Sequence, residues 1–355
     1  MMLRGGLKAC GREIFLGKCS FEAKFFVIKF GFDYISAKEN FPEAVKKNLL
    51  ILDFSGSLRA EGILPENDRA NDRSESGASD SYCGLENGCL SDPDNPINLL
   101  KVSLQITASN DSAEIEAEVL DLRGLEGTRC YCDEAAEEEI VRRIAPFRYG
   151  GERWREFPIH FIDTGEYHYL SKFFVDTIDV PFTLLVLDNH TDMQEPAFGE
   201  GLLSCGGWLA DVMRSPKALQ AVILAGPGGR IALYEPCDTF GADGEKCGNF
   251  LLVETEELSA EGMKNICDKI SIDNLYVSID KDVMSVDCYR TGWSQGELSL
   301  DELKLILSRL LEEYSGSLLG IDICGGLPEA QPALTCDLAL NRRTDLALLA
   351  ALLTK

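Results

Sequence analysis

The stretch Phe182-Thr183-Leu184-Leu185-Val186-Leu187-Asp188-Asn189-His190-Thr191-Asp192 decides the fold, because an unbroken apolar run ends directly in acids and a histidine. Such a run is typical of a strand that is buried on both faces of a parallel sheet. Further short apolar runs lie at residues 159–162, 221–224, 275–279 and 318–323. Segments with helical spacing lie between or after them, at residues 169–176, 203–214, 259–270, 300–314 and 343–353. We therefore predict a three-layer α/β/α fold over residues 146–355, with a parallel sheet between two layers of helices.

Residues 1–145 are expected to form a β-rich region in front of this core. Apolar or alternating segments at 25–30, 49–54, 99–107 and 113–122 indicate strands, and an acidic helix is expected at 133–144. Residues 64–96 are crowded with Asp, Asn, Ser, Gly and Glu, which is typical of an exposed and mobile insertion. Our hypothesis is that this region adds strands to the core and shapes access to the functional site.

The composition argues against several classes of partner. The formal net charge is -25, from 59 acidic and 34 basic side chains, which disfavours nucleic acid and anionic membrane surfaces. No run approaches the roughly 18 apolar residues of a membrane-spanning helix, and residues 1–19 lack the apolar run of a signal peptide. The 13 cysteines show no paired zinc-site spacing and are expected to be reduced thiols. We predict a cytoplasmic protein with no nucleic-acid or membrane partner, and the sequence leaves a homo-oligomer open.

Three predicted strands end in residues that can bind metal. Functional groups of an open parallel sheet gather at the carboxyl ends of its strands, so these ends are expected to meet. Alternate side chains of extended chain point the same way, which should bring Asp188, His190 and Asp192 together and turn Lys281 away from its two neighbours. The predicted ligands are His168, Asp188, His190, Asp192, Asp280 and Asp282.

These ligands define the kind of metal that the site would bind. Two histidines and four carboxylates suit manganese, with zinc, iron, nickel and cobalt as lesser candidates. Carboxylates can bridge, so the set suffices for two divalent ions. So many ionisable groups at the apolar mouth of a sheet would be costly without a cation. The sequence therefore predicts two divalent metal ions, with Mn²⁺ favoured.

The same residues resemble the motifs of a known family, the arginases and agmatinases, or ureohydrolases. The family motifs G-G-x-H, D-A-H-x-D and S-x-D-x-D match Gly165-Glu166-Tyr167-His168, Asp188-Asn189-His190-Thr191-Asp192 and Ser278-Ile279-Asp280-Lys281-Asp282. A fourth element, L-[ST]-x-x-E, matches Leu298-Ser299-Leu300-Asp301-Glu302. The resemblance covers residue 158 to the C-terminus and implies a sheet of the arginase type.

This resemblance also implies a reaction. One ion would be held by His168, Asp188, Asp192 and Asp280, and the other by Asp188, His190, Asp280 and Asp282. A linear C–N bond would be hydrolysed, most simply in a guanidino group, with release of urea from arginine or from an arginine-containing compound or peptide. Asp192 would carry the proton to the leaving nitrogen, and Glu302 would bind the cationic substrate by a bidentate pair. A plainer interpretation of Glu302 is an acid in the first turn of a helix that Ser299 caps.

Departures from the motifs keep alternatives open. Glu166 replaces the second glycine of the first motif, and Asn189 replaces the alanine of the second. Arginases and agmatinases carry a further loop histidine, whereas this chain has Ser204-Cys205-Gly206-Gly207 in that region. The pattern is closer to a divergent branch that includes enzymes acting on arginine within peptides. The alternatives are a metal-binding protein without turnover and a deacetylase-like amidohydrolase, although the latter needs a histidine pair and only His160 remains.

Overall fold

The computed structural model describes residues 48–61, 63–64, 99–108, 111–194, 201–214, 218–226, 249–253, 274–313, 317–328 and 334–353. Three sequence predictions lie outside these residues: the strand at 25–30, the helix at 259–270 and all but the first residue of the polar insertion at 64–96. Among the described helices, none has the length and apolar character that a membrane span requires.

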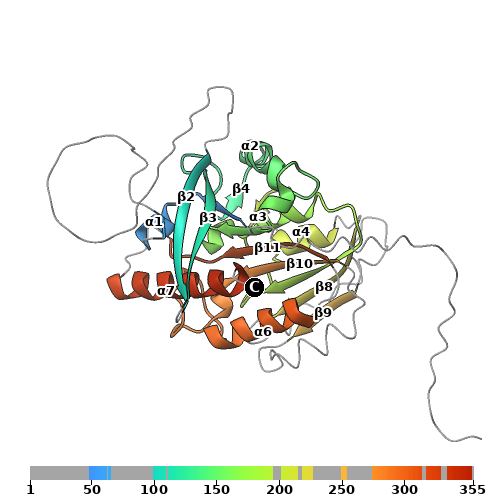
Figure 1. The fold of residues 1–355 in the computed structure, drawn as a ribbon. Coiled ribbons are helices and arrows are strands. Elements are labelled where there is room, and N and C mark those ends of the chain that lie inside the picture. The colour runs from blue at the N-terminus through green and yellow to red at the C-terminus, as the bar shows by residue number, and fades with distance from the viewer. Residues whose placement is uncertain are drawn as a thin grey trace, which may run out of the picture. The chain divides into compact units, whose positions relative to one another are not determined.

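A nine-stranded sheet forms the centre of the described part of the chain (Figure 1). All neighbouring strands are parallel except the pair at one edge, where β2 runs antiparallel to β3. The strands lie in the order β2 (Leu99–Ala108), β3 (Asp111–Asp121), β1 (Leu49–Asp53), β5 (Ile159–Ile162), β11 (Ser317–Cys324), β10 (Asn274–Asp280), β6 (Phe182–Leu187), β8 (Leu219–Ala225) and β9 (Asn249–Val253).

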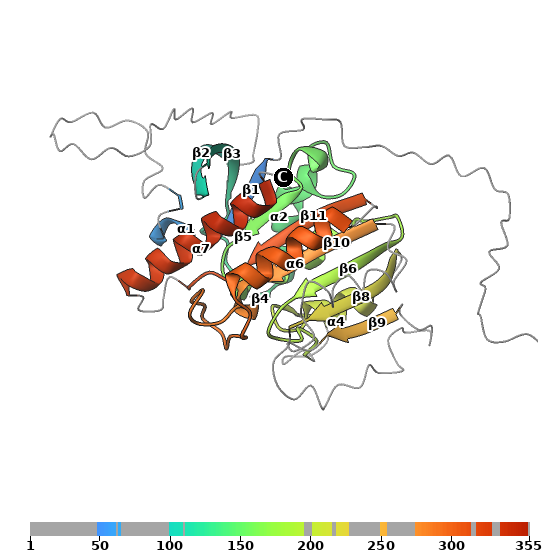
Figure 2. The same ribbon diagram turned by 60° about the horizontal axis from the view of Figure 1, so that its bottom comes forward.

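Helices cover both faces of this sheet, which confirms the predicted three layers. α6 (Leu300–Glu313) and α7 (Thr335–Leu353) cross one face, as Figure 2 shows, and share a core with Leu185 and Leu187 of β6. The other face is covered by α2 (Glu134–Ile144), α3 (Leu170–Val175) and α4 (Trp208–Arg214), which pack with Leu184 and Val186. Alternate residues of β6 enter opposite cores, so both faces of this strand had to be largely apolar.

The strands before residue 145 belong to the same sheet as those after it. β1 pairs with β3 on one side and β5 on the other, so that Ile51 lies opposite both Val119 and Phe161. A separate two-stranded sheet joins β4 (Tyr131–Cys132) to β7 (Leu203–Ser204). The chain also forms the short helix α1 (Ser57–Ala60) and 3-10 turns η1 (Ala145–Phe147), η2 (Trp154–Glu156), η3 (Gly165–Tyr167) and η5 (Lys281–Val283).

Some predicted boundaries were wrong. The helix expected from residue 203 begins at Trp208, because Leu203 and Ser204 form β7 instead. The last helix begins at Thr335 rather than at residue 343, and its first turns are largely exposed, so they lack the apolar pattern that marks a packed helix. β9 was not predicted.

A buried charged cluster joins η5 to the C-terminal helix. The Lys281 side chain is fully buried, and its Nζ donates to Tyr289 Oη at 2.6 Å and Asp345 Oδ1 at 2.9 Å. Beside this pair, Asn341 Nδ2 donates to Glu61 Oε1 at 2.9 Å. Burial, reinforced by the charge of Asp345, raises the pKa of Glu61 from its ordinary 4.5 to about 8. Glu61 is therefore protonated in the folded protein near neutral pH.

This raised pKa predicts how the stability of the fold depends on pH. Between pH 4.5 and pH 8 the folded state keeps a proton on Glu61 that the unfolded state has lost, so the contribution of Glu61 to stability falls as pH rises. Glu61→Gln removes this ionisation but keeps an acceptor for Asn341. We expect the free energy of unfolding in urea, measured for both proteins at several pH values, to rise by a few kcal/mol in the variant relative to the wild type as the pH increases across this range. Parallel stability curves would contradict the protonated state of Glu61.

Candidate metal centre

The candidate centre lies where three neighbouring strands of the sheet have their carboxyl ends. Asp280 and Cys324 are the last residues of β10 and β11 and lie opposite each other in the register, and Asp188 directly follows β6. His168 follows η3, which comes after β5. Because these strands are parallel, their carboxyl ends meet, as the sequence predicted.

Carboxylates surround one ring nitrogen of His168. Its Nδ1 lies 2.9 Å from Asp192 Oδ2, 3.3 Å from Asp188 Oδ2 and 3.6 Å from Asp280 Oδ2. The other ring nitrogen, Nε2, lies 2.9 Å from Ser278 Oγ. The contact with Ser278 orients the imidazole so that Nδ1 faces the acids.

His190 forms a second group with Asp188 and Asp282. Its Nδ1 lies 2.8 Å from Asp282 Oδ2 and 3.6 Å from Asp188 Oδ1, and its Nε2 lies 2.8 Å from Ser294 Oγ. These hydrogen bonds and charges of Asp188 and Asp282 raise the pKa of His190 to about 11. Asp188 thus turns one oxygen toward each histidine, which is the placement of a bridging carboxylate.

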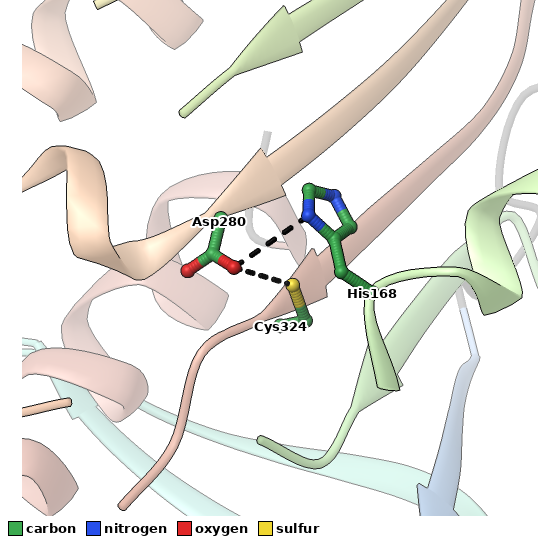
Figure 3. Close-up of side chains that lie close together, drawn as sticks. All are labelled: His168, Asp280 and Cys324. Atoms are coloured by element: carbon green, nitrogen blue, oxygen red, sulfur yellow. Dashed lines mark hydrogen bonds and ion pairs between the residues drawn. The ribbon is translucent and has the colours of Figure 1, made fainter. Parts of the chain in front are cut away.

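Cys324 is a further member of the centre that the sequence reasoning missed. Figure 3 shows its thiol and the His168 ring both approaching the same oxygen of the Asp280 carboxylate, Oδ2, which lies 3.3 Å from Cys324 Sγ and 3.6 Å from His168 Nδ1. His168, Asp280 and Cys324 form one of three described clusters whose side chains could hold a metal ion. The signal was available, since Cys324 directly follows the apolar run at 318–323 and so stands at a strand end.

Unpartnered buried atoms test whether these residues fit a cation. Within the described residues, His168 Nδ1 and Asp188 Oδ2 are buried and make no hydrogen bond, despite their mutual distance of 3.3 Å. Buried polar atoms without a partner are rare and costly. Burial and the charges of Asp282 and Asp188 also raise the pKa of Asp280 to about 7. Nitrogen and oxygen donors that face one another in this way fit a divalent metal ion.

The predicted ligands converge through turns, so the expectation that extended chain brings them together was wrong. Asp192 has a left-handed φ of 49°, and its Oδ2 accepts a hydrogen bond from Trp208 Nε1 at 2.7 Å. Asp282 lies in η5, where its backbone N–H donates to Asp280 Oδ1 at 2.9 Å. Lys281 does turn away from both carboxylates, into the buried cluster with Asp345.

The structure does not bring Glu302 to the other predicted site residues. It lies exposed in the first turn of α6, where Ser299 N and Oγ donate to its Oε2 at 2.9 and 2.6 Å. The Glu302 backbone N–H in turn donates to Ser299 Oγ at 3.3 Å, so the two residues form a reciprocal cap. The substrate-binding role of Glu302 stays a prediction.

A cavity of about 230 Å³ opens beside the centre. Its described lining comprises Cys130, Tyr131, Gly165, His190, Asp192, Gln194, Ser204, Cys205, Gly206, Asp280, Asp282 and Trp293. His160 is not in this lining; it is buried, with Nδ1 2.7 Å from Asp322 Oδ1. Ser204, Cys205 and Gly206 also line the cavity.

Comparisons with known proteins gave the following similarities. No protein-family model matches the chain. An uncharacterized protein of Thermotoga maritima is 28% identical over 244 residues, which span 66% of this chain and 88% of that protein.

Among solved structures, a hypothetical agmatinase from Burkholderia thailandensis has a TM-score of 0.46 at 15% identity, over 63% of this chain and 68% of that one. Arginase from Bacillus subtilis has a TM-score of 0.46 at 15% identity, over 62% and 79%. Proclavaminate amidinohydrolase from Streptomyces clavuligerus has a TM-score of 0.44 at 18% identity, over 62% and 70%. These neighbours come from the arginase (ureohydrolase) superfamily whose motifs the sequence resembles.

Metal binding can be tested by thermal unfolding. A cation that binds only the folded state at 100 times its Kd stabilises it by about 2.7 kcal/mol, so Mn²⁺ should raise the unfolding temperature of stripped protein by roughly 5 °C. His168→Ala and Asp188→Asn should abolish this response, whereas Asp301→Asn, an exposed acid on α6, should keep it. An unchanged unfolding temperature, with no manganese retained after gel filtration, would refute the centre.

Alanine substitutions at two glycines, both with a positive φ, distinguish a loss of metal binding from a general loss of stability. At Gly325, φ is +104° and an added Cβ would lie 2.4 Å from Asp280 Oδ1, whereas at Gly150, φ is +80° and nothing lies within 4 Å. Gly325→Ala should therefore displace Asp280 and weaken Mn²⁺ binding at least about tenfold, since a misplaced ligand loses its contact. Gly150→Ala should cost only about 1 kcal/mol of stability, measured by urea unfolding, and leave Mn²⁺ affinity unchanged. Equal Mn²⁺ affinities in the two variants would contradict this.

Proposed function

We propose that this chain is a binuclear, manganese-type metal hydrolase that cleaves a linear C–N bond outside peptide bonds. The substrate would be a guanidino compound, either arginine or an arginine-containing compound or peptide, and urea would be released. The observation that carries the proposal is the Asp188 carboxylate, whose two oxygens face His168 and His190 while His168 Nδ1 stays without a hydrogen bond among the described residues.

The residues that would hold two ions divide into two overlapping groups. The first is His168, Asp188, Asp192 and Asp280, and the second is Asp188, His190, Asp280 and Asp282. Cys324 lies against the first group and adds a soft donor to it. Bound divalent ions would lower the pKa of a water molecule by several units and so supply a nucleophile near neutral pH.

The charge of the centre favours a cationic substrate. Its four carboxylates would balance two divalent ions, so no excess positive charge would remain to attract phosphate esters. A chain with a net charge of -25 would also attract a guanidinium from solution. Glu302 would add a carboxylate for that group only if its cap with Ser299 opened.

Asp192 would hold and pass the proton of the reaction. Trp208 Nε1 donates to its Oδ2, so Oδ1 would be the oxygen that takes a proton from the attacking water and gives it to the leaving nitrogen. The Leu209 N–H donates to the Asp192 carbonyl oxygen at 3.0 Å, so α4 fixes the backbone as well as the side chain. This double attachment supports a left-handed conformation that an aspartate adopts only occasionally.

The two alternatives differ from this proposal in observable ways. A deacetylase-like reaction needs a histidine pair in addition to the two predicted ligands, and the one remaining histidine, His160, is paired with Asp322 outside the cavity lining. A metal-binding protein without turnover is motivated by Ser204, Cys205 and Gly206, which occupy the cavity wall where a loop histidine is missing. Urea release separates that alternative from the enzyme.

The proposal is tested with protein reconstituted with Mn²⁺ and assayed for urea release from arginine, agmatine and arginine-containing peptides. One of these should yield urea, and Asp192→Asn should lower kcat by about 10²- to 10⁴-fold because proton transfer is lost. Metal content is measured in parallel, and Asp211→Asn, an acid on α4 that pairs with Arg214, serves as the control. Protein that binds manganese but releases no urea from any of these compounds would count against a ureohydrolase.

A further inference from the structure

Trp293 presents a large aromatic surface at the mouth of the acidic cavity. It is 41% exposed, and it lines the cavity together with His190, Asp280 and Asp282. Its indole ring lies 6.1 Å from the His190 ring, centroid to centroid, with the planes inclined by 72°, so the two rings do not stack. The indole therefore lies beside the centre but is not buried in the hydrophobic core.

The missing side chain of Gly165 leaves room for both the Trp293 indole and the Asp280 carboxylate. A Cβ at this position would lie 3.0 Å from Trp293 Cδ1, 3.1 Å from Trp293 Nε1 and 3.1 Å from Asp280 Oδ2. The aromatic ring and a carboxylate of the centre thus converge on one point of bare backbone. A glycine is needed here for space, because the backbone φ of Gly165 is not in the left-handed region.

The loop that carries Trp293 is fastened on both sides of the ring. The Trp293 N–H donates to Thr291 Oγ1 at 3.1 Å, and Asn189 Nδ2 donates to the Ser294 carbonyl oxygen at 2.9 Å. Gln295 Nε2 donates to two backbone carbonyl oxygens, of Met284 and Tyr289. The backbone that carries the indole is therefore held in place before any ligand arrives, which reduces the entropy lost on binding.

An aromatic face beside a group of carboxylates selects a particular ligand chemistry. The face of an indole attracts cations, and it stacks best on flat, delocalised ones, whereas carboxylates bind the N–H groups at the edge of such a cation. We propose that Trp293 is a specificity-determining residue whose indole stacks on the planar guanidinium or amidinium group of the substrate. This inference rests on the proposed function, because it assigns the recognition of the reacting cation to a residue outside the family motifs.

A purely apolar cover over the cavity would need the size of the side chain but not its π-electrons. The two roles are separated by Trp293→Phe, which keeps an aromatic face, and Trp293→Leu, which keeps apolar surface alone. Leu305→Ala is the matched control, since Leu305 is also an exposed large apolar residue, 49% accessible, but lies on α6 and not in the cavity lining.

The experiment measures binding of N-propylguanidinium and of its neutral isostere N-propylurea to the Mn²⁺-loaded protein by calorimetry. Trp293→Leu should weaken binding of the guanidinium by about 3- to 30-fold and leave the urea unchanged, with Trp293→Phe between Leu and wild type. Leu305→Ala should bind both probes like the wild type. Manganese content and unfolding temperature of each variant show that the centre and the fold are intact.

The possible results separate this inference from the proposed function. Equal losses for both probes, or no loss for either, would overturn the stacking role of Trp293. Selective loss of guanidinium binding would support it even if no compound released urea, in which case the hydrolase proposal alone would fail. Urea release with guanidinium affinity unchanged in Trp293→Leu would leave the hydrolase proposal standing and overturn the inference.

Discussion

Repulsion among the carboxylates at the carboxyl ends of the central strands is the constraint on which the rest of this structure depends. Asp188, Asp192 and Asp280 all lie within 3.6 Å of the same nitrogen of His168. Burial removes these charged groups from water, so each carboxylate raises the free energy needed to ionise its neighbours. The raised pKa of Asp280, about 7, expresses that cost in the protein alone. A divalent cation would remove it, which is why the arrangement supports a metal centre better than a structural polar cluster.

The surrounding fold holds the crowded groups in place from behind. Lys281, between two of the acids, is anchored by Asp345 of α7 and by Tyr289, so buried hydrogen bonds join the C-terminal helix to η5. Trp208 of α4 binds Asp192 from the opposite face of the sheet. Each layer of helices thus fixes one turn of the centre, and the buried partners leave the carboxylates few alternative positions.

Local sequence patterns predicted two kinds of contact: those between residues close in the chain, and those that the pairing of parallel strands brings about. The apolar runs before Asp188 and Asp280 indicated buried parallel strands, and the parallel arrangement alone brings their ends together. The same reasoning missed Cys324, although it also follows an apolar run, because a single cysteine lacks the motif spacing that drew attention to the aspartates. The sequence offered two roles for Glu302: binding the substrate, and an acid in the first turn of a helix that Ser299 caps. The structure contains the cap, which joins residues only three apart in the chain.

The sequence by itself determined the layered parallel sheet and which acids and histidines follow its strands, because apolar runs and strand ends are properties of short segments. Only the tertiary structure decided how the ligands meet: through the left-handed turn at Asp192 and the 3-10 turn at Asp282 rather than through extended chain. It alone brought Glu61 and Asp345 to Lys281, and Trp293 over Gly165. These contacts join segments far apart in the chain, and no local pattern specifies which distant side chain will fill a given space.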